Sequence, residues 1–470
     1  MSNRDNQNGK NEQNGKNNPS NSDFREAGDA VFAALLERVG EAAPRPRLAP
    51  TRRALDLLGD PQTAYPIIHI TGTNGKTSTS RIAESILRAY GLRTGLLTSP
   101  HLVRLNERIV IDGQPISDEF LAANWADIQP YLQMVDAELL ANGDEPLTFF
   151  EALTALAFAC FADSPVDVAV IEVGMGGEWD STNVADGQVA VFTPIALDHT
   201  MRLGGTIAEI ARTKSGIIKL SASVVSAAQS EQAQAELERA VELTESTLAT
   251  EGEEFALLTS QVAVGGQLIS VRGLAGTYGD LFLPLYGTHQ AQNAAVAIAA
   301  VESFLGAGAQ PLVGDLLAEG LGTATSPGRL QLVGVEPTVL VDAAHNPHGA
   351  TALAAALDAY FDFDEIVAVV GILADKDAKG IITTLQPQVK RFHVTQSHSD
   401  RSIPVDDLAD QVAAWTSEEM TFRFEDLTHA LDGAREWAQE SPRRAVIVTG
   451  SITLVGEALA LADAGEWMTP

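Results

Sequence analysis

The amino-acid sequence predicts an α/β protein with two domains, each built around a mostly parallel sheet. Short apolar segments rich in β-branched residues alternate with longer amphipathic stretches, a pattern typical of parallel βα units. These segments form two series, separated by a Gly- and Ser-containing stretch at residues 322–328 that predicts a hinge. The expected strands are Ile67–Ile70, Thr94–Leu97, Val166–Val173 and Val189–Ile195 before it, and Thr338–Val341, Ile366–Gly371, Arg391–Thr395, Thr421–Phe424 and Ala445–Val448 after it.

Length and composition suggest where the domains begin and end. The chain has 470 residues, enough for two or three domains with sizeable cores. Residues 1–23 are mainly Asn, Gln, Gly, Lys and Ser, which cannot bury a core, so we expect a disordered tail there. We divide the rest of the chain near residue 327, into a larger domain over residues 24–327 and a smaller, Rossmann-like domain over residues 328–470.

The charge and the cysteine content disfavour several classes of partner. With 31 Lys and Arg against 62 Asp and Glu, the formal net charge is −31, which opposes the attraction of nucleic acid. No apolar run is long enough to span a bilayer, and the single cysteine excludes an intramolecular disulfide, so we expect a cytoplasmic protein without a membrane partner. Anionic substrates then need local cations, for which the candidates are Lys76, Arg104, Arg108, Lys214, Arg329, Lys376 and Arg401.

The first expected strand leads into a glycine-rich turn, GTNGKTS at residues 72–78, and then into a helix from Ser78 to about Ala89. Such a turn points backbone N–H groups at one spot, where Lys76 adds a charge for phosphates and the next hydroxyl can ligate Mg²⁺. A complete Walker A motif has a further glycine at the position of Ile70, so only its core is present. We predict a P-loop ATPase domain, with an ordinary turn and a surface lysine as the alternative.

Polar residues also follow the later strands, at the edge where open α/β sheets place their ligands. Glu172 ends one strand before a glycine-rich stretch and is a candidate Mg²⁺ ligand, and His199 follows the next strand. Asp342 and His345 follow the first strand of the second series. Each of these has a structural alternative when taken singly, and Lys214 taken alone is expected on the solvated face of a helix.

Taken together and in order, segments of the chain resemble the folylpolyglutamate synthases and dihydrofolate synthases, relatives of the Mur ligases, and in particular the bifunctional bacterial members. The resemblance runs from about residue 45 to the end of the chain. The matching segments are GTNGKTS at 72–78, TSPHL at 98–102, NERI at 106–109, LTFFE at 147–151, EVGMGGEWDSTNV at 172–184, LDHT at 197–200, TKSGI at 213–217, GTHQAQNA at 287–294, SPGR at 326–329, DAAHNP at 342–347 and VTGSITLVGEA at 448–458. The family's common GKGS is here GKTS, which leaves open whether Thr77 or Ser78 contacts Mg²⁺.

The resemblance implies an ATP-dependent amide ligase. The acceptor carboxylate takes the γ-phosphoryl group, and the amine of L-glutamate then displaces phosphate from the acyl phosphate. The implied acceptors are dihydropteroate, reduced folates or both, the implied cofactors are ATP and one or two Mg²⁺, and the expected state is a monomer. A Mur-type ligase with another carboxylate acceptor is the alternative, but only about fifty foldable residues precede Gly72, too few for the separate UDP-binding domain of those enzymes.

The resemblance also implies roles for individual residues. Nucleotide binding is implied for Thr73, Asn74, Gly75, Lys76, Thr77, Ser78, Asn293, Arg329 and Asp342. Metal binding is implied for Thr77, Ser99, Glu172, His199 and Lys214, with Lys214 carbamylated by CO₂. Catalytic roles are implied for Lys76, Glu172, His199, Lys214, Asp342, His345 and Ser451. Binding of the pteridine substrate is implied for Ser99, Thr148, Phe149, Phe150, Glu151, Trp179, Asp180 and Ser181, although Phe149 or Phe150 can equally be a core residue.

Overall fold

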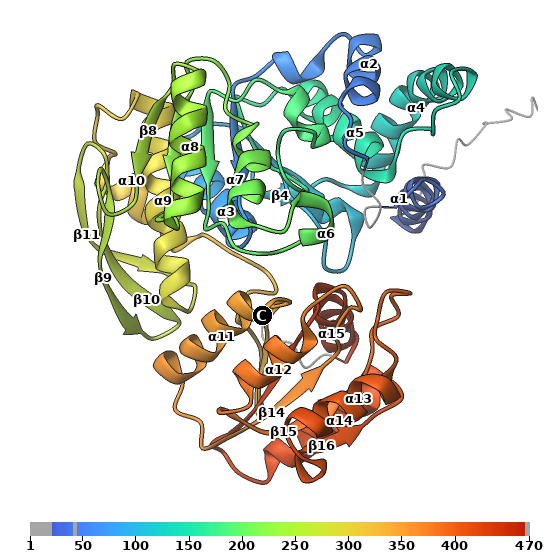
Figure 1. Ribbon diagram of the computed structural model, residues 1–470, viewed down its shortest axis with the longest axis vertical. Coiled ribbons are helices and arrows are strands. Elements are labelled where there is room, and N and C mark those ends of the chain that lie inside the picture. Colours follow the sequence, from blue (N-terminus) through green and yellow to red (C-terminus); the bar gives the residue numbers. More distant parts are fainter. Residues whose placement is uncertain (1–20, 41–44, 466–470) are drawn as a thin grey trace, which may run out of the picture.

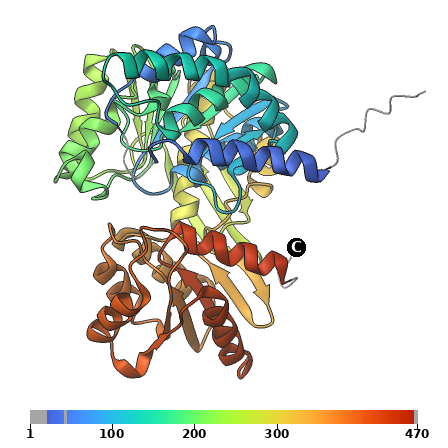
Figure 2. The same ribbon diagram turned by 90° about the vertical axis from the view of Figure 1, so that its right-hand side faces the viewer.

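The computed structural model describes residues 21–40 and 45–465, and it confirms the α/β architecture with its two main sheets (Figure 1). The larger sheet lies in the upper part of Figure 1 and the smaller one in the lower part, and the turned view in Figure 2 shows the two parts stacked along the long axis. Every strand of both expected series is present. The expected tail at residues 1–23 falls mostly outside the described residues, and helix α1 begins at Asn21.

The larger sheet has eight strands in the order β4-β3-β2-β5-β1-β6-β7-β8. The six neighbouring strands β2, β5, β1, β6, β7 and β8 are parallel. Beyond β2, the strands β3 and β4 extend the sheet by antiparallel pairing. The bounds are β1 Ile67–Thr71, β2 Thr94–Leu97, β3 Ile109–Ile111, β4 Gln114–Pro115, β5 Val168–Glu172, β6 Val189–Phe192, β7 Ser223–Ser226 and β8 Thr247–Thr250.

Alternate residues of the central strands supply two different cores, because successive side chains of a strand point to opposite faces. Ile68 and Ile70 pack with the helices α3 and α9 on one face, whereas Ile67 and Ile171 pack with α4 and α5 on the other. The helices of this part are α1 Asn21–Leu36, α2 Ala49–Leu57, α3 Lys76–Ala89, α4 Asp118–Ala141, α5 Phe149–Asp163, α6 Thr200–Leu203, α7 Ile207–Ser215, α8 Glu231–Leu243, α9 Thr288–Gly306 and α10 Gly314–Gly322, with the 3₁₀ helices η1 Pro61–Thr63, η2 Leu105–Arg108 and η3 Ser181–Val184.

A separate three-stranded antiparallel sheet, in the order β11-β10-β9, has no counterpart in the sequence prediction. Its strands are β9 Ala256–Ala263, β10 Gly266–Arg272 and β11 Thr277–Leu283. Buried residues of β10 and β11 pack into the same core as α3 and α9. This sheet therefore extends the core around the helix that follows the glycine-rich turn.

The smaller sheet has six strands in the order β12-β13-β17-β14-β15-β16, all parallel except for the antiparallel edge strand β12. Helices α11 to α13 pack on one face and α14 and α15 on the other, as in a doubly wound fold. The elements are β12 Gln331–Val335, β13 Thr338–Val341, α11 Pro347–Tyr360, β14 Glu365–Val370, α12 Ala378–Leu385, β15 Val389–Val394, α13 Val405–Trp415, η4 Glu418–Met420, β16 Thr421–Arg423, α14 Leu427–Gln439, β17 Arg444–Thr449 and α15 Ile452–Ala464.

Strand register brings the polar strand ends of the larger sheet together. Ile70 pairs with Glu172, and Thr71 pairs with Phe192, so β1, β5 and β6 end at the same edge. The glycine-rich turn leaves the sheet at this edge, which faces the smaller sheet's part of the molecule in Figure 1. Across the described residues, no helix combines the length and apolarity needed to cross a membrane.

Candidate active site

The glycine-rich turn, residues 72–78, is fitted tightly between β6 and α9. Gly72 and Gly75 have positive φ angles of 150° and 91°, which residues with a side chain rarely adopt. A Cβ atom at Gly72 would collide with Thr193, whose carbonyl oxygen would lie 2.8 Å away. A Cβ atom at Gly75 would lie 2.5 Å from Oδ1 of Asn293. Asn293 is therefore held directly against the turn.

Two lysines converge on one carbonyl group of this turn. Lys76 Nζ donates to the carbonyl oxygens of Gly72 and Thr73, both at 3.2 Å, and Lys214 Nζ donates to the carbonyl oxygen of Gly72 at 2.7 Å. Lys214 is only 4% exposed, so the expectation of a solvated lysine, drawn from its helix alone, is wrong. Burial, and the charge of Lys76, lower the pKa of Lys214 to about 7, which makes its neutral amine accessible near neutral pH.

The two hydroxyl groups after Lys76 face different partners. Thr77 Oγ1 donates to both carboxylate oxygens of Glu172, at 2.9 and 3.0 Å. Ser78 Oγ instead lies 2.9 Å from Oγ of Ser326 in the hinge segment. The backbone N–H of Ser99, not its hydroxyl, donates to Glu172 at 3.3 Å. Burial raises the pKa of Glu172, against the opposing effects of Lys76 and Thr77. Of the two hydroxyl groups, only that of Thr77 therefore contacts the candidate metal ligand Glu172.

A carboxylate that the sequence analysis did not select, Asp198, links the two parts of the molecule. Its oxygens lie 2.9 Å from Lys376 Nζ, 3.8 Å from His345 Nε2 and 3.9 Å from His199 Nε2. Burial alone would raise the pKa of Asp198, but His345, His199 and Lys376 outweigh it and hold that pKa well below its usual range. Burial lowers the pKa of His199 to about 4, so this ring is neutral near pH 7.

A second contact joins the glycine-rich turn to the start of α11. The side-chain amides of Asn74 and Asn346 exchange two hydrogen bonds, at 3.3 and 3.1 Å, and Asn74 Nδ2 also donates to His348 Nδ1 at 2.9 Å. Asn346 is the N-cap of α11 and accepts from the backbone N–H of Gly349. The turn that is predicted to hold phosphates is therefore bonded to the opposite domain.

Two other predicted residues of the second part hold its own backbone. Asp342 accepts hydrogen bonds from the backbone N–H groups of Leu330 and Ala344, both at 2.8 Å, and burial raises its pKa. Ser451 is the N-cap of α15 and accepts from the Leu454 N–H at 3.2 Å. Both side chains lie at strand ends that face the larger sheet's part, but their observed bonds are internal.

Some of the residues predicted to contact a pteridine form the start of α5. Thr148 and Glu151 make a capping box, in which each side chain accepts from the other residue's backbone N–H, at 3.3 and 2.7 Å. Arg47 also holds Glu151, with two hydrogen bonds at 2.9 Å. Phe149 is 3% exposed in the core, beneath the guanidinium of Arg108. The observed contacts of Thr148, Glu151 and Phe149 therefore hold the start of α5 in place.

The remaining pteridine candidates surround the glycines after Glu172. A Cβ atom at Gly174 would lie 2.5 Å from the ring of half-buried Phe150 and 3.1 Å from Asp180. Asp180 accepts from the N–H groups of Met175 and Thr182, at 2.9 and 3.0 Å, so it shapes this loop. Phe150 and Asp180 therefore both lie against Gly174, which is two residues after Glu172.

Trp179 and Ser181 flank Asp180 in the same loop. Trp179 is half-buried and lies beside Gly176, where a Cβ atom would be 3.5 Å from its ring. Ser181 is buried, with its hydroxyl 3.0 Å from that of Thr154 on α5. Of the two, Trp179 has the more exposed surface for a ligand.

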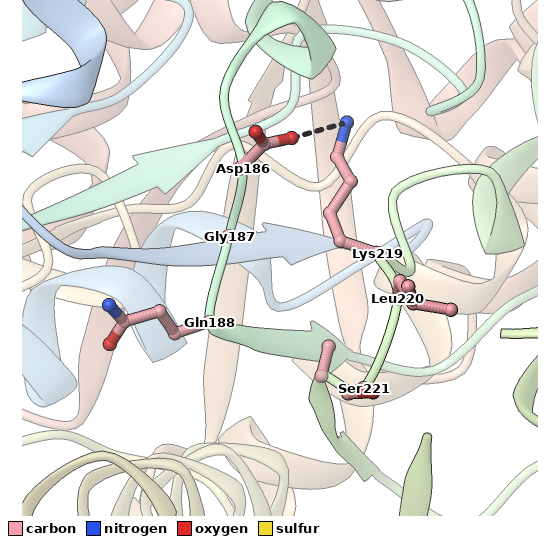
Figure 3. A pocket seen from close by; sticks show the side chains of 7 residues that line it. Asp186, Gly187, Gln188, Lys219, Leu220 and Ser221 are labelled. Atoms are coloured by element: carbon pink, nitrogen blue, oxygen red, sulfur yellow. Dashed lines mark ion pairs between the residues drawn. The ribbon is translucent and has the colours of Figure 1, made fainter. Parts of the chain in front are cut away.

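A shallow hollow of about 430 Å³ lies elsewhere, and none of the predicted site residues lines it (Figure 3). Gly187 and Gln188 precede β6, and Ala222 precedes β7, so the hollow is at the opposite edge of the sheet from the glycine-rich turn. Lys219 and Asp186, 3.7 Å apart, form an ion pair at its rim. Parallel sheets place ligands at the other edge, and this hollow is not the candidate site.

Comparison with known proteins matches both parts of the chain. Residues 70–301 match the model of the Mur ligase middle domain, and residues 328–452 match that of the Mur ligase glutamate ligase domain. The chain is 42% identical to the dihydrofolate synthase/folylpolyglutamate synthase of Mycobacterium tuberculosis over 449 residues, which cover 91% of this chain and 92% of the relative. The chain belongs to the dihydrofolate synthase/folylpolyglutamate synthase family.

Solved structures of this family have the same fold. A folylpolyglutamate synthase from M. tuberculosis complexed with ADP superimposes with a TM-score of 0.90 at 41% identity, covering 94% of this chain and 99% of that one. The Escherichia coli enzyme in complex with DHPP and ADP gives a TM-score of 0.80 at 30% identity, covering 93% and 98%. As a member of this family, the chain is an ATP-dependent ligase with the domains of the Mur ligase superfamily.

The oxygen donors near the turn suit the Mg²⁺ that the family implies. Thr77 offers a hydroxyl and Glu172 a carboxylate, and Mg²⁺ commonly takes one or two carboxylates while phosphates and water complete its shell. Across residues 21–40 and 45–465, no three His, Cys, Asp or Glu side chains gather as a metal site.

Sequence reasoning selected Asn74 and His345 but missed the residues that they contact across the two domains. Asp198 had one available signal, its position beside the candidate His199 after a strand. Lys376 was noted only as a possible local cation, and Asn346 lies within a matched segment without an assigned role. Their contacts span 148 to 272 positions of sequence, so no local pattern reveals them.

Proposed function

We propose that this chain adds L-glutamate to dihydropteroate and extends reduced folates by γ-linked glutamates, forming ADP and phosphate. The observation that carries the proposal is the contact between Thr77 and Glu172 at a turn whose Gly72 carbonyl oxygen accepts from the buried Lys214, in a chain that matches this ligase family over both domains. A Mur-type ligase with another carboxylate acceptor is the alternative. Phe150 and Asp180 favour the pteridine acceptor, because they offer a flat apolar face and a hydrogen-bond acceptor near Glu172.

Phosphoryl transfer comes first. The nucleotide phosphates bind the backbone N–H groups at the start of α3 and the ammonium of Lys76, with Asn293 and Arg329 contributing to nucleotide binding. An oxygen of the acceptor carboxylate attacks the γ-phosphorus, and the bond to the β-bridging oxygen breaks, so ADP leaves and an acyl phosphate forms. Most of the catalysis here is positioning and neutralisation of charge, which the buried cationic turn provides.

Thr77 and Glu172 would hold the Mg²⁺ ion, with Ser99 beside them. When bound, Mg²⁺ neutralises the charge on the phosphate oxygens during transfer. Lys214 contributes in a modified form: its neutral amine attacks CO₂, a proton is lost, and the lysine cation becomes a carbamate anion. The pKa of about 7 supports this step, because only the neutral amine is a nucleophile. The carbamate and His199 would then hold a second Mg²⁺.

Amide formation follows at the interface of the two domains. His345 Nδ1 lies 2.9 Å from the carbonyl oxygen of Ala343, which can only accept, so the neutral ring carries its proton on Nδ1. Nε2 of His345, which faces the Asp198 carboxylate, then accepts the proton that the glutamate ammonium loses before attack. Asp198, 3.8 Å from Nε2, stabilises the resulting imidazolium. The amine attacks the acyl carbon, and the tetrahedral intermediate expels phosphate.

The proposal includes two domains, residues 24–327 and 328–470, that act as a monomer in the cytoplasm. The division near residue 327 is supported by the change of sheet between β11 and β12 and by the gap between the two matched family models. Asp342, which also accepts from the Leu330 N–H, would contact the nucleotide, and Ser451, the N-cap of α15, would lie near the glutamate or the transferring phosphate. Closure of the domains then brings the two halves of the site together.

The deciding experiment measures phosphate release with ATP, Mg²⁺ and L-glutamate, in parallel with dihydropteroate and with a reduced folate. The number of glutamates added to each product is determined by mass spectrometry. One glutamate on dihydropteroate and further glutamates on the folate are the expected result. Turnover of the folate alone would restrict the enzyme to chain extension and remove the pteridine role of Phe150 and Asp180. No turnover with either acceptor would favour a Mur-type ligase with a different substrate.

A further inference from the structure

Arg81 lies on the second turn of α3, on the side that faces the hinge segment. Ser78 and Ser85 mark this side, because Ser78 contacts Ser326 and Ser85 Oγ donates to the carbonyl oxygen of Gly320 at 2.7 Å. Arg81 comes three residues after Ser78 and four before Ser85, and residues with this spacing share one face of a helix. Its side chain is thus bracketed by two contacts between α3 and residues 320–326.

Among the residues that the structure describes, the half-buried guanidinium group of Arg81 has no partner. Its Nε atom is shielded from solvent without a hydrogen bond, and within the described part of the chain its side chain makes no hydrogen bond or ion pair. Burial lowers the pKa of Arg81, and nearby carboxylates only partly oppose this effect. A buried charge without a partner is unfavourable, so a partner supplied from outside the chain would be bound strongly.

The nearby carboxylates are committed elsewhere. Glu172 accepts from Thr77, and Glu84 accepts from Thr94 and lies 3.3 Å from Arg88. The third, Glu107, accepts hydrogen bonds from three successive backbone N–H groups, those of Leu102, Val103 and Arg104. None of these three carboxylates forms an ion pair with Arg81 in the described residues.

A second arginine adds positive charge on the same side. Arg329 follows the hinge directly, is half-buried, and also lacks a side-chain hydrogen bond or ion pair among the residues described. It acts electrostatically on Arg81, as one cation on another. An anion between the two groups would replace this repulsion with two attractions, and each planar guanidinium can bind two oxygens at once.

We propose that Arg81 and Arg329 form an oxyanion-binding site beside the hinge, with Arg81 as its unassigned member. The inference rests on the proposed function, since it takes its ligand from the substrates of that reaction. Its ligand is a carboxylate or phosphate group of a bound substrate. The site is distinct from the start of α3, because Arg81 lies five residues beyond Lys76, roughly 7.5 Å further along the helix axis. Binding there would add a link between α3 and the residue that follows the hinge, beside the existing contacts of Ser78 and Ser85.

The test measures binding directly, so that it does not depend on turnover. ADP, L-glutamate and dihydropteroate are titrated separately into the wild type and the Arg81→Met, Arg81→Lys and Arg239→Ala variants by calorimetry. Arg239 is a matched control, because it is an exposed arginine on α8 whose ion-pair partner, Glu236, lies 3.6 Å away. Loss of a charged hydrogen bond predicts a roughly ten- to hundredfold weaker affinity of Arg81→Met for one ligand, with partial recovery in Arg81→Lys and no change in Arg239→Ala.

The ligand that is affected identifies the source of the anion. Weaker binding of ADP assigns the site to a phosphate, and weaker binding of glutamate or dihydropteroate assigns it to that carboxylate. Unchanged affinity for all three ligands would overturn the inference, even if the wild type turns over both acceptors. If the wild type shows no turnover, the proposed reaction is wrong. A selective loss of affinity in Arg81→Met would still support the anion site in that case.

A thermal melt separates ligand binding from a structural role. Unliganded Arg81→Met is expected to melt at or above the wild-type temperature, because it loses an unpaired charge, and to gain less stability on adding the affected ligand. A lower melting temperature together with equal losses of affinity for every ligand would make Arg81 a structural residue and overturn the inference.

Discussion

Replacing Lys214 by methionine is expected to stabilise the folded protein near neutral pH and to abolish turnover. Methionine keeps an unbranched side chain of similar length in the buried site but removes the charge. The hydrogen bond to the Gly72 carbonyl is lost, yet that oxygen still accepts from Lys76 at 3.2 Å, so no buried group is orphaned. The substitution therefore isolates the effect of burying the ammonium group.

The size of the effect follows from the pKa of Lys214, which is about 7 in the folded protein against an ordinary value of 10.5. At about 1.36 kcal/mol for each pH unit, this difference corresponds to a destabilisation of about 5 kcal/mol. Because the folded pKa is the lower one, the unfolded chain binds more protons between these values, and wild-type stability rises with pH through this window. The destabilisation is complete below about pH 7 and absent above about pH 10.5.

The assay is urea unfolding of the wild type and Lys214→Met in CO₂-free buffers from pH 6.5 to 9.5. The variant's advantage should shrink by about 3 kcal/mol between pH 7 and 9.5. Lys390→Met is the control, because the Lys390 side chain is 64% exposed, and it should show no such trend. An advantage that stays constant over this range would refute the reasoning. Bicarbonate should raise wild-type activity and leave the variant inactive, because only the lysine can form a carbamate.

Three further predictions concern the other contacts of the site. Thr77→Ala should raise the Mg²⁺ concentration needed for half-maximal activity about tenfold or more, and Ser78→Ala should not, because only Thr77 faces Glu172; equal effects in a Mg²⁺ titration would contradict this. Asp198→Asn and Lys376→Met should show a coupling of about 1–3 kcal/mol in a double-mutant unfolding cycle, and additive effects would mean that the ion pair contributes nothing. Thr148→Ala should lower the unfolding free energy by about 1 kcal/mol without changing the KM for dihydropteroate, and a raised KM with unchanged stability would restore the substrate role.

Most of the nine expected strands were predictable because they are buried on both faces. Ile67–Ile70 and the other expected segments are short apolar runs, and a parallel sheet covered by helices requires such runs. The prediction did not include the strands β3, β4, β7, β8 and β12, which lie at or next to a sheet edge, or the strands β9 to β11. The last three pair antiparallel and mix polar with apolar residues, as in Gly266–Arg272, so no apolar run marks them. Their burial depends on packing against α9, which the local pattern does not encode.

The candidate site was predictable where one short segment supplies the chemistry. Lys76 and Thr77 lie where the glycine-rich turn implied, and strand register brought Glu172 to them. Thr148 and Glu151 show the limit of such inference, because one sequence pattern serves both as a capping box and as a candidate substrate contact. The pairing of Asp198 with Lys376 was beyond prediction, because it depends on how two separately folded sheets are placed.

The two glycines of the turn bear on how mutational tolerance is interpreted. Substituting either Gly72 or Gly75 drives a side chain into Thr193 or Asn293 and demands a backbone angle that other residues avoid. A saturation screen would score both positions as intolerant even under selection for folding alone. Invariance at these glycines would therefore measure how closely the turn is packed, and a screen would need the neighbouring positions, such as Thr77, to report on nucleotide use.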